Sequence, residues 1–184
     1  MVARQSAGSI LYASVSFQLP EPDEADVALT TMPDDLPEPE DPSLRNDSWG
    51  ALMDRRVVDL ATTDDGHRMG YWIRLSTDLD DDPTTHVCAL TFMSDSAPFR
   101  SGRATHPEFT NDERDRTRFV GASLDHSMWF HRPSLATDWH WFDTRSHGLA
   151  NGRGLVTGDV VTRSGVHSFT LAQQILLRRN RHVD

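Results

Sequence analysis

One strong helix signal, followed by a run of strand-forming segments, constrains the fold of this chain most. Asp82 and Pro83 form a helix start, with Asp as the N-cap and Pro at the first helical position. The next segment, THVCALTFM, is apolar almost all round, which predicts a buried helix that Pro98 ends. Further strands are predicted at 119–131, 139–147, 153–162 and 166–178. This order indicates the α+β class, with a long antiparallel sheet wrapped around a central helix.

The part before that helix divides into segments of different character. Residues 2–18 are predicted to form two strands around a turn at Ala7-Gly8. Residues 20–47 hold six of the ten prolines and ten acidic residues against one arginine, which is typical of an extended linker that crosses a surface. Residues 57–61 and 67–76 then read as a hairpin around Asp64-Asp65-Gly66. We therefore expect a terminal hairpin at 1–19, a linker at 20–53 and a folded domain at 54–184.

The charge and the basic residues exclude several kinds of chemistry. The net charge is −10, and the linker accounts for most of it, because 18 acidic and 17 basic residues remain elsewhere. All 18 basic residues are arginine, which excludes Schiff-base lysines and P-loop lysines. The acidity argues against nucleic-acid binding. The nine histidines show no spacing typical of a metal site, so no metal is expected. No cofactor is expected either.

The single cysteine and the distribution of apolar residues set expectations for packing and location. Cys88 has no partner for an internal disulfide, and its apolar neighbours predict a buried small hydrophobic residue. No apolar run approaches the roughly 18 residues of a membrane helix. The N-terminal segment lacks the apolar core of a signal peptide. We expect a cytoplasmic protein with no membrane partner.

The segment SLDHSMWFHRP, residues 123–133, places Ser, Asp and His within four residues of one another. Read as one strand, it puts Ser123 and Asp125 on one face and His126 on the other. Asp125 and His126 then point apart and cannot act together on a serine. No G-x-S-x-G motif occurs in the chain. The segment alone therefore does not predict a Ser-His-Asp hydrolase.

Three polar residues conflict with their local patterns, and such conflicts are common at functional sites. Asp95 follows the apolar helix, where a carboxylate suits general-base chemistry; the alternative is a solvated helix end. Gln173 interrupts an otherwise largely apolar strand face, so its amide is either structural or functional. Ser123 begins the segment above, and a lone serine in a strand is most often structural.

Four segments together resemble the acyl-CoA thioesterase II family. They are, in chain order, FMSDS (92–96), ASLDHSMWFHRP (122–133), RGLVTGDV (153–160) and LAQQILLR (171–178). Those enzymes have a double hot-dog fold, in which each half is a long helix wrapped by an antiparallel sheet. The resemblance implies that residues 54–180 are the second hot-dog unit. It also implies that residues 2–18 are the last two strands of the first unit, most of which lies outside this sequence.

The resemblance also implies a site and a reaction. Members of the family hold a water with an Asp at the helix end, a Thr or Ser before Asp-His, and a Gln in the last strand, which correspond here to Asp95, Ser123 and Gln173. The implied reaction is hydrolysis of fatty acyl-CoA to free fatty acid and CoA. Two departures from the family pattern are Gln174-Ile175 in place of Glu-Gly, and Ser134 in place of a bulky residue.

Three further expectations concern alternatives and assembly. The chain could instead be a non-catalytic acyl-CoA-binding remnant. A hot-dog enoyl-CoA hydratase is disfavoured, because such enzymes use an Asp and a His close together on one surface, and the strand pattern places Asp125 and His126 on opposite faces. A lone hot-dog unit leaves a strand edge uncovered, so we expect a homodimer or larger homo-oligomer.

Overall fold

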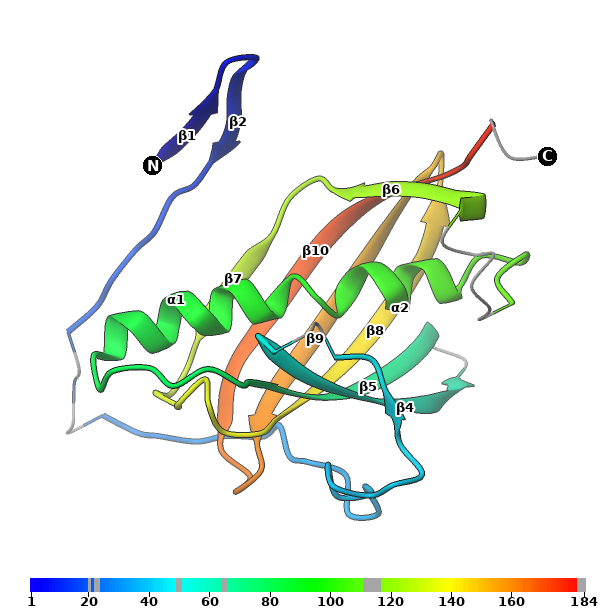
Figure 1. Cartoon of the computed structure of the whole chain (residues 1–184). Coiled ribbons are helices and arrows are strands. Elements are labelled where there is room, and N and C mark those ends of the chain that lie inside the picture. Colours follow the sequence, from blue (N-terminus) through cyan, green and yellow to red (C-terminus); the bar gives the residue numbers. More distant parts are fainter. Residues whose placement is uncertain (20, 22–23, 49–50, 64–65, 111–116, 182–184) are drawn as a thin grey trace.

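The computed structural model describes residues 1–19, 21, 24–48, 51–63, 66–110 and 117–181. Within this part of the chain, one antiparallel sheet of eight strands lies beside two helices (Figure 1). The strand order is β3-β4-β5-β8-β9-β10-β6, and β7 also pairs with β10. The strands are β3 (Arg45–Asn46), β4 (Met53–Thr63), β5 (Gly66–Leu75), β6 (Phe119–Ser123), β7 (Ser127–Phe130), β8 (His140–Ala150), β9 (Arg153–Thr162) and β10 (His167–Arg179). The predicted α+β arrangement, a sheet wrapped around a helix, is confirmed.

The helical layer consists of α1 (Pro83–Ser94) and α2 (Pro98–Ala104), which follow one another across the sheet in Figure 1. The helix start was predicted correctly, since the Asp82 side chain accepts a hydrogen bond from the backbone N–H of Thr84 at 3.0 Å. Pro98 has the opposite role to the one expected, because it begins α2 instead of ending the first helix. Proline lacks an N–H and is tolerated in the first turn of a helix. The result is a break at residues 95–97 between two helices.

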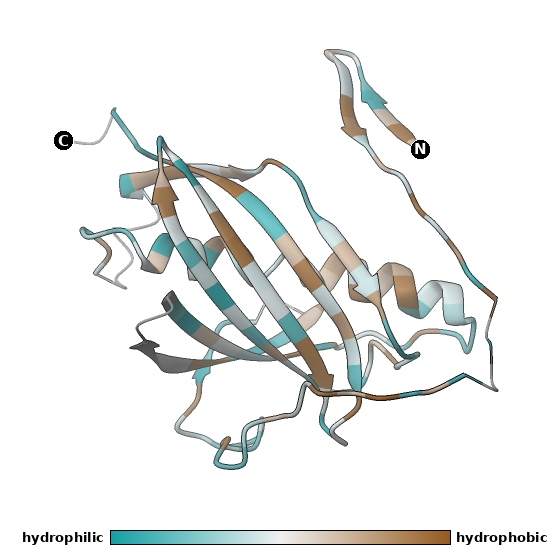
Figure 2. Cartoon of the chain, turned by 180° about the vertical axis from the view of Figure 1, so that it is seen from behind, coloured by the Kyte–Doolittle hydropathy of each residue, from teal (hydrophilic) through white to brown (hydrophobic). Residues whose placement is uncertain are grey.

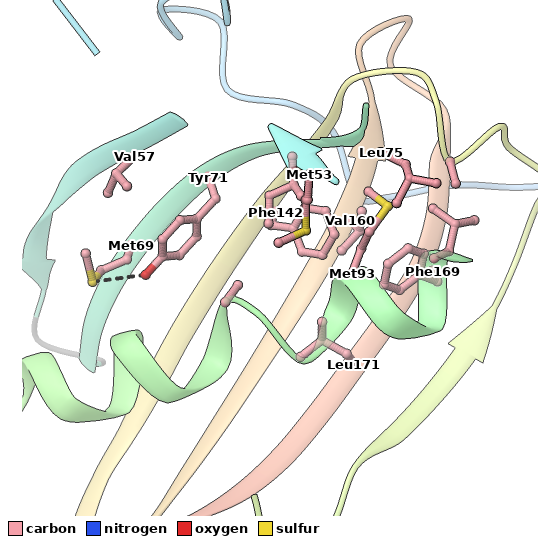
Figure 3. Close-up of a cluster of buried hydrophobic side chains, with 14 residues drawn as sticks. Met53, Val57, Met69, Tyr71, Leu75, Met93, Phe142, Val160, Phe169 and Leu171 are labelled. Atoms are coloured by element: carbon pink, nitrogen blue, oxygen red, sulfur yellow. Dashed lines mark hydrogen bonds between the residues drawn. The ribbon is translucent and has the colours of Figure 1, made fainter. Parts of the chain in front are cut away.

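The main hydrophobic core lies between the helices and the concave face of the sheet. Leu90, Met93 and Ala97 of the helical layer pack against side chains from five long strands, among them Tyr71, Phe142, Val160, Phe169 and Leu171 (Figure 3). The predicted alternation along β10 is confirmed, because every second residue from His167 to Leu177 is buried. Burial on this face fixes the register of β10, since a shift by one residue would turn the apolar set outward.

A second apolar cluster, on the other side of the sheet, holds the linker against the domain. Trp72, Trp139 and Trp141 pack together there with Met32, Leu36 and Leu44 of the linker. The indole N–H of Trp72 donates to the backbone oxygen of Pro37 at 2.8 Å. Acidic linker side chains also pair with arginines of the domain, as in Asp47 with Arg55 at 2.6 Å and Glu38 with Arg163 at 2.8 Å. Residues 32–48 are thus attached to the sheet by apolar packing and ion pairs.

The N-terminal hairpin stands apart from this sheet. β1 (Val2–Gln5) and β2 (Gly8–Tyr12) pair only with each other within the described residues, and Figures 1 and 2 show them beyond the edge of the domain. Gly8, in the predicted turn, has a φ of +121°, which only glycine adopts without strain. The strand after the linker, β4, is longer than predicted. Residues 64–65 of the expected Asp64-Asp65-Gly66 turn lie outside the described residues, and the division of the chain at residues 19 and 53 stays a prediction.

Candidate active site

Asp95 is placed by the break between the two helices. Its backbone N–H caps the end of α1 by donating to the carbonyl of Met93, and Pro98 starts the next helix three residues later. A side chain at this position is not covered by a continuing helix, and Asp95 is accordingly exposed. The interruption caused by Pro98 therefore presents a carboxylate at the edge of the core.

Ser123 and Gln173 reach the same point from two neighbouring strands. Ser123 is the last residue of β6, where it pairs with Ile175 of β10. Gln173 lies in the buried face of β10, is fully inaccessible to solvent, and pairs with Val156 of β9. Gln173 lies two residues after Leu171, which packs in the core with the helical layer, so the Gln173 side chain is on the face of β10 that the helices cover. The sheet thus brings residues 50 positions apart in the chain next to each other.

The three predicted side chains form a closed set of hydrogen bonds. Ser123 Oγ donates to Asp95 Oδ1 at 2.8 Å, and Gln173 Nε2 donates to the same oxygen at 2.8 Å. The second hydrogen on Gln173 Nε2 is donated to Ser123 Oγ at 2.5 Å. No hydrogen bond within the described part of the chain reaches Asp95 Oδ2. That oxygen is therefore available to accept a proton from a water molecule.

The segment between β6 and β7 differs from the prediction of one continuous strand. Residues 124–126 leave the strand, and the Asp125 carboxylate accepts the backbone N–H of Gln174 at 2.8 Å. A side chain thus takes the place of a backbone carbonyl in the ladder, as short acidic side chains often do. Asp125 and His126 bond to different partners, Asp125 to the backbone of Gln174 and His126 to the side chains of Gln173 and Ser94. This arrangement gives no support to a hydratase that uses them together.

His126 is the residue that the sequence reasoning missed. Its ring contacts Gln173 Oε1 through Nδ1 at 2.8 Å and Ser94 Oγ through Nε2 at 2.7 Å. Ser94 is fully buried at the end of α1 and also lies 2.7 Å from the carbonyl oxygen of Thr91. The sequence does place His126 directly after Asp125 and close to Ser123, which could have marked it as a candidate. The interpretation of residues 123–133 as one strand instead predicted that its ring lies on the face opposite Ser123.

A small apolar hollow lies beside the middle of α1. Val87 and Leu90 of α1 form one wall, and Phe130 and the following residues His131, Arg132, Pro133 and Ser134 form the other; its volume is about 240 Å³. The same helix carries Asp95 at its C-terminal end, and the strand that ends at Phe130 begins one residue after His126. The hollow and Asp95 therefore lie along the same helix.

The helix α1 is less buried than predicted. Its inner face is covered by the sheet, but Val87 and Phe92 are 36% and 47% exposed, and Cys88 is exposed as well. The prediction that Cys88 is buried is wrong. An all-apolar helix pattern does not tell which face the rest of the chain covers, and here the described residues cover only one.

The described residues contain no candidate for a metal site or for a membrane-spanning helix. Among the described residues, no group of three or more His, Cys, Asp or Glu side chains is arranged to hold a metal ion. No helix in the described part of the chain is long and apolar enough to cross a membrane.

Comparison with known proteins identifies the family. Residues 28–177 match the family described as "Acyl-CoA thioesterase C-terminal domain". The chain belongs to this family. The family match covers most of the chain, and it includes all three polar side chains described above.

Relatives of this acyl-CoA thioesterase domain support the same assignment. The chain is 33% identical over 109 residues to mouse acyl-coenzyme A thioesterase 8, and 29% identical over 107 residues to acyl-CoA thioesterase 2 of Haemophilus influenzae. These alignments cover 59% and 58% of this chain but 32% and 36% of the relatives. The chain thus spans about a third of the length of the curated relatives it matches.

Solved structures confirm the predicted hot-dog fold. Acyl-CoA thioesterase II TesB2 of Mycobacterium marinum superimposes with a TM-score of 0.72 at 31% identity, covering 86% of this chain and 60% of that one. A protein of Alicyclobacillus acidocaldarius whose structure is described as having a hot-dog fold superimposes with a TM-score of 0.60 at 15% identity, covering 86% of this chain and 58% of that one. The predicted resemblance to the acyl-CoA thioesterase II family is confirmed.

Proposed function

We propose that this domain hydrolyses fatty acyl-CoA thioesters to a free fatty acid and CoA. The observation that carries the proposal is the mutual contact of Asp95, Ser123 and Gln173, which come from a helix end and two strands. Family membership supports the substrate class. The apolar hollow beside α1 supports an acyl group as the part of the substrate that the domain would bind.

The proposed mechanism is direct attack by water, with no covalent enzyme intermediate. Water donates one hydrogen to Asp95 Oδ2 and the other to Ser123 Oγ, which still has a lone pair after accepting from Gln173. Asp95 removes the proton as the water oxygen bonds to the thioester carbonyl carbon. The tetrahedral intermediate then collapses, the C–S bond breaks, and CoA leaves as a thiolate that takes up the proton held by Asp95, which returns to its carboxylate form. Gln173 orients the water by holding Asp95 and Ser123 at fixed positions.

The test of this proposal is release of free CoA thiol from a series of acyl-CoA substrates by the purified chain. Turnover that saturates with substrate supports hydrolysis. The alternative, a non-catalytic acyl-CoA-binding domain, predicts acyl-CoA binding without release of thiol. Hydration of an enoyl-CoA in the same samples would support the hydratase alternative instead.

We also propose that the domain works as a homodimer or a larger homo-oligomer. Within the described residues, β6 and β7 pair only with β10, so their outer edge is open. Large apolar side chains on these strands and on the neighbouring helix are exposed, among them Val120, Trp129, Phe130 and Phe92. An open strand edge with exposed apolar groups tends to pair with another chain.

Light scattering combined with dilution tests this assembly. We expect a particle at least twice the 20.7 kDa of one chain, with specific activity that falls as the protein is diluted. A monodisperse monomer with turnover proportional to protein concentration contradicts the proposed assembly. It leaves the hydrolase proposal intact.

A further inference from the structure

His126 connects the three candidate catalytic side chains to the buried end of α1. Of the described residues, three have side chains that hydrogen-bond to the Gln173 amide: Asp95 and Ser123 at Nε2, and His126 at Oε1. The opposite edge of the imidazole meets Ser94, which is fully buried. The ring is therefore held between the helix and the strand that carries Gln173.

The positions of the protons in this network follow from the partners. An ionised Asp95 only accepts hydrogen bonds, so the atom of Gln173 that faces it is the amide nitrogen. The amide oxygen then faces His126, and an oxygen can only accept. Nδ1 of His126 must therefore carry a hydrogen. Gln173 Oε1 is buried, and without this donor it would lack a side-chain partner.

The need for this donor is greatest after Asp95 has taken a proton on Oδ2. Oδ1 still accepts from the Gln173 amide, but as part of a neutral carboxyl group it holds the amide nitrogen less strongly than the carboxylate does. The Nδ1–H of His126, donated to the amide oxygen on the other side, then helps to hold the amide in the same orientation.

We propose that His126 is a positioning residue for thioester hydrolysis, because its Nδ1–H keeps the Gln173 amide nitrogen directed at Asp95 and Ser123. This inference rests on the proposed function of the site. It goes beyond that function by assigning a role to a side chain that the water and the thioester need not touch.

Ser94 can either donate a hydrogen bond to Nε2 of His126 or accept one from it. The ring can therefore keep the hydrogen on Nδ1 both as a neutral imidazole and as an imidazolium. In the neutral ring, Nε2 accepts the hydroxyl hydrogen of Ser94. In the imidazolium, Nε2 donates to Ser94 Oγ, and the hydroxyl hydrogen is donated to the carbonyl of Thr91, 2.7 Å away. Nδ1–H faces Gln173 in both forms. The position of the amide is therefore independent of the charge on the ring.

Kinetics of two matched variants test the role. His126→Leu removes both ring nitrogens, and we expect kcat to fall about 10- to 100-fold, as for loss of other groups that orient a reacting residue, with little change in KM. His126→Asn places an amide N–H near the position of Nδ1, and it should retain most of the activity. Equal losses of kcat in the two variants would overturn the proposal.

A double-mutant cycle shows whether His126 acts through Gln173. In a Gln173→Ala background the amide is absent, so adding His126→Leu should lower kcat little further. An undiminished loss in that background would show that His126 acts on the reaction by another route, and would overturn the proposal.

The ring nitrogens of the wild-type chain provide a test that needs neither turnover nor a folded leucine variant. Nitrogen-15 spectra distinguish the two ring nitrogens, and comparison with His126→Asn assigns the signal among the nine histidines. We expect a protonated Nδ1, in a neutral or a doubly protonated ring. A neutral ring protonated at Nε2 alone would overturn the proposal. Absence of thioesterase activity would refute the proposed function and would not alter this result.

Discussion

Replacing Gln173 by Glu tests the proposed hydrogen-bond network with a change of one atom. The side-chain shape is retained, and the oxygen that faces His126 stays in place. The amide nitrogen, which lies 2.8 Å from Asp95 Oδ1 and 2.5 Å from Ser123 Oγ, becomes a second oxygen. Two carboxyl groups at this distance share a proton, so the new group donates one hydrogen bond at most, where the amide donates two.

The expected magnitude follows from the bonds that are lost. A hydrogen bond to a charged group contributes about 1.5–3 kcal/mol and one between neutral groups about 0.5–1.5 kcal/mol, so loss of one or both removes about 0.5–4.5 kcal/mol. If that stabilisation is present in the transition state, kcat falls about 2- to 2,000-fold.

The assay is release of CoA thiol at saturating substrate, with Gln174→Glu as the matched control. Gln174 is the next residue of β10, and its side chain lies on the other face of the strand. We expect Gln174→Glu to keep wild-type kcat. Wild-type kcat in Gln173→Glu, in a variant with unchanged thermal stability, would refute the reasoning.

Three other predictions concern the site and its support. Ser123→Ala should lower kcat less than Gln173→Ala, because water can partly replace a hydroxyl; steady-state kinetics of the two variants check the order, and a larger loss for Ser123→Ala would contradict it. Burial lowers the pKa of His140 to about 4 in the folded chain. As the pH falls, His140 therefore takes up a proton in the unfolded chain before it does so in the folded chain. The free energy of unfolding should therefore drop by about 3 kcal/mol between pH 6.5 and 4, and denaturant titrations of wild type and His140→Gln should show a smaller drop in the variant. A Cβ on Gly70 would lie 1.9 Å from the Trp141 ring, so Gly70→Ala should destabilise the domain by about 1–3 kcal/mol. Adding Trp141→Phe should recover part of that loss, and strictly additive losses would contradict the packing.

The elements with a regular pattern were predicted well from the sequence. The alternation along residues 167–177 placed Gln173 on the buried face, and Asp82-Pro83 marked the first residues of α1. These features depend on neighbours in the chain, so they can be read locally. The resemblance to the acyl-CoA thioesterase II family then predicted that Asp95 and Ser123 lie at the same site as Gln173. No local sequence pattern indicates that these three residues meet.

The features that depend on distant partners were missed. Pro98 begins a helix, whereas a proline in the sequence alone fits the end of a helix as well as the start. Asp125 interrupts the strand because it bonds to the backbone of Gln174, 49 residues away. His126 lies in the segment that leaves the strand, and its ring contacts Gln173, 47 residues away. Such contacts are fixed by tertiary structure and leave no periodic signal.

The most direct test of the central claim is the turnover of Asp95→Asn beside the wild-type chain. The asparagine oxygen can still accept from Ser123 and Gln173, so the network and the fold should be retained, while the base is lost. We predict that the wild-type chain releases CoA from fatty acyl-CoA, and that kcat of Asp95→Asn is about 10²–10⁴-fold lower at equal thermal stability. An unchanged kcat in Asp95→Asn would contradict the proposal that Asp95 activates the attacking water.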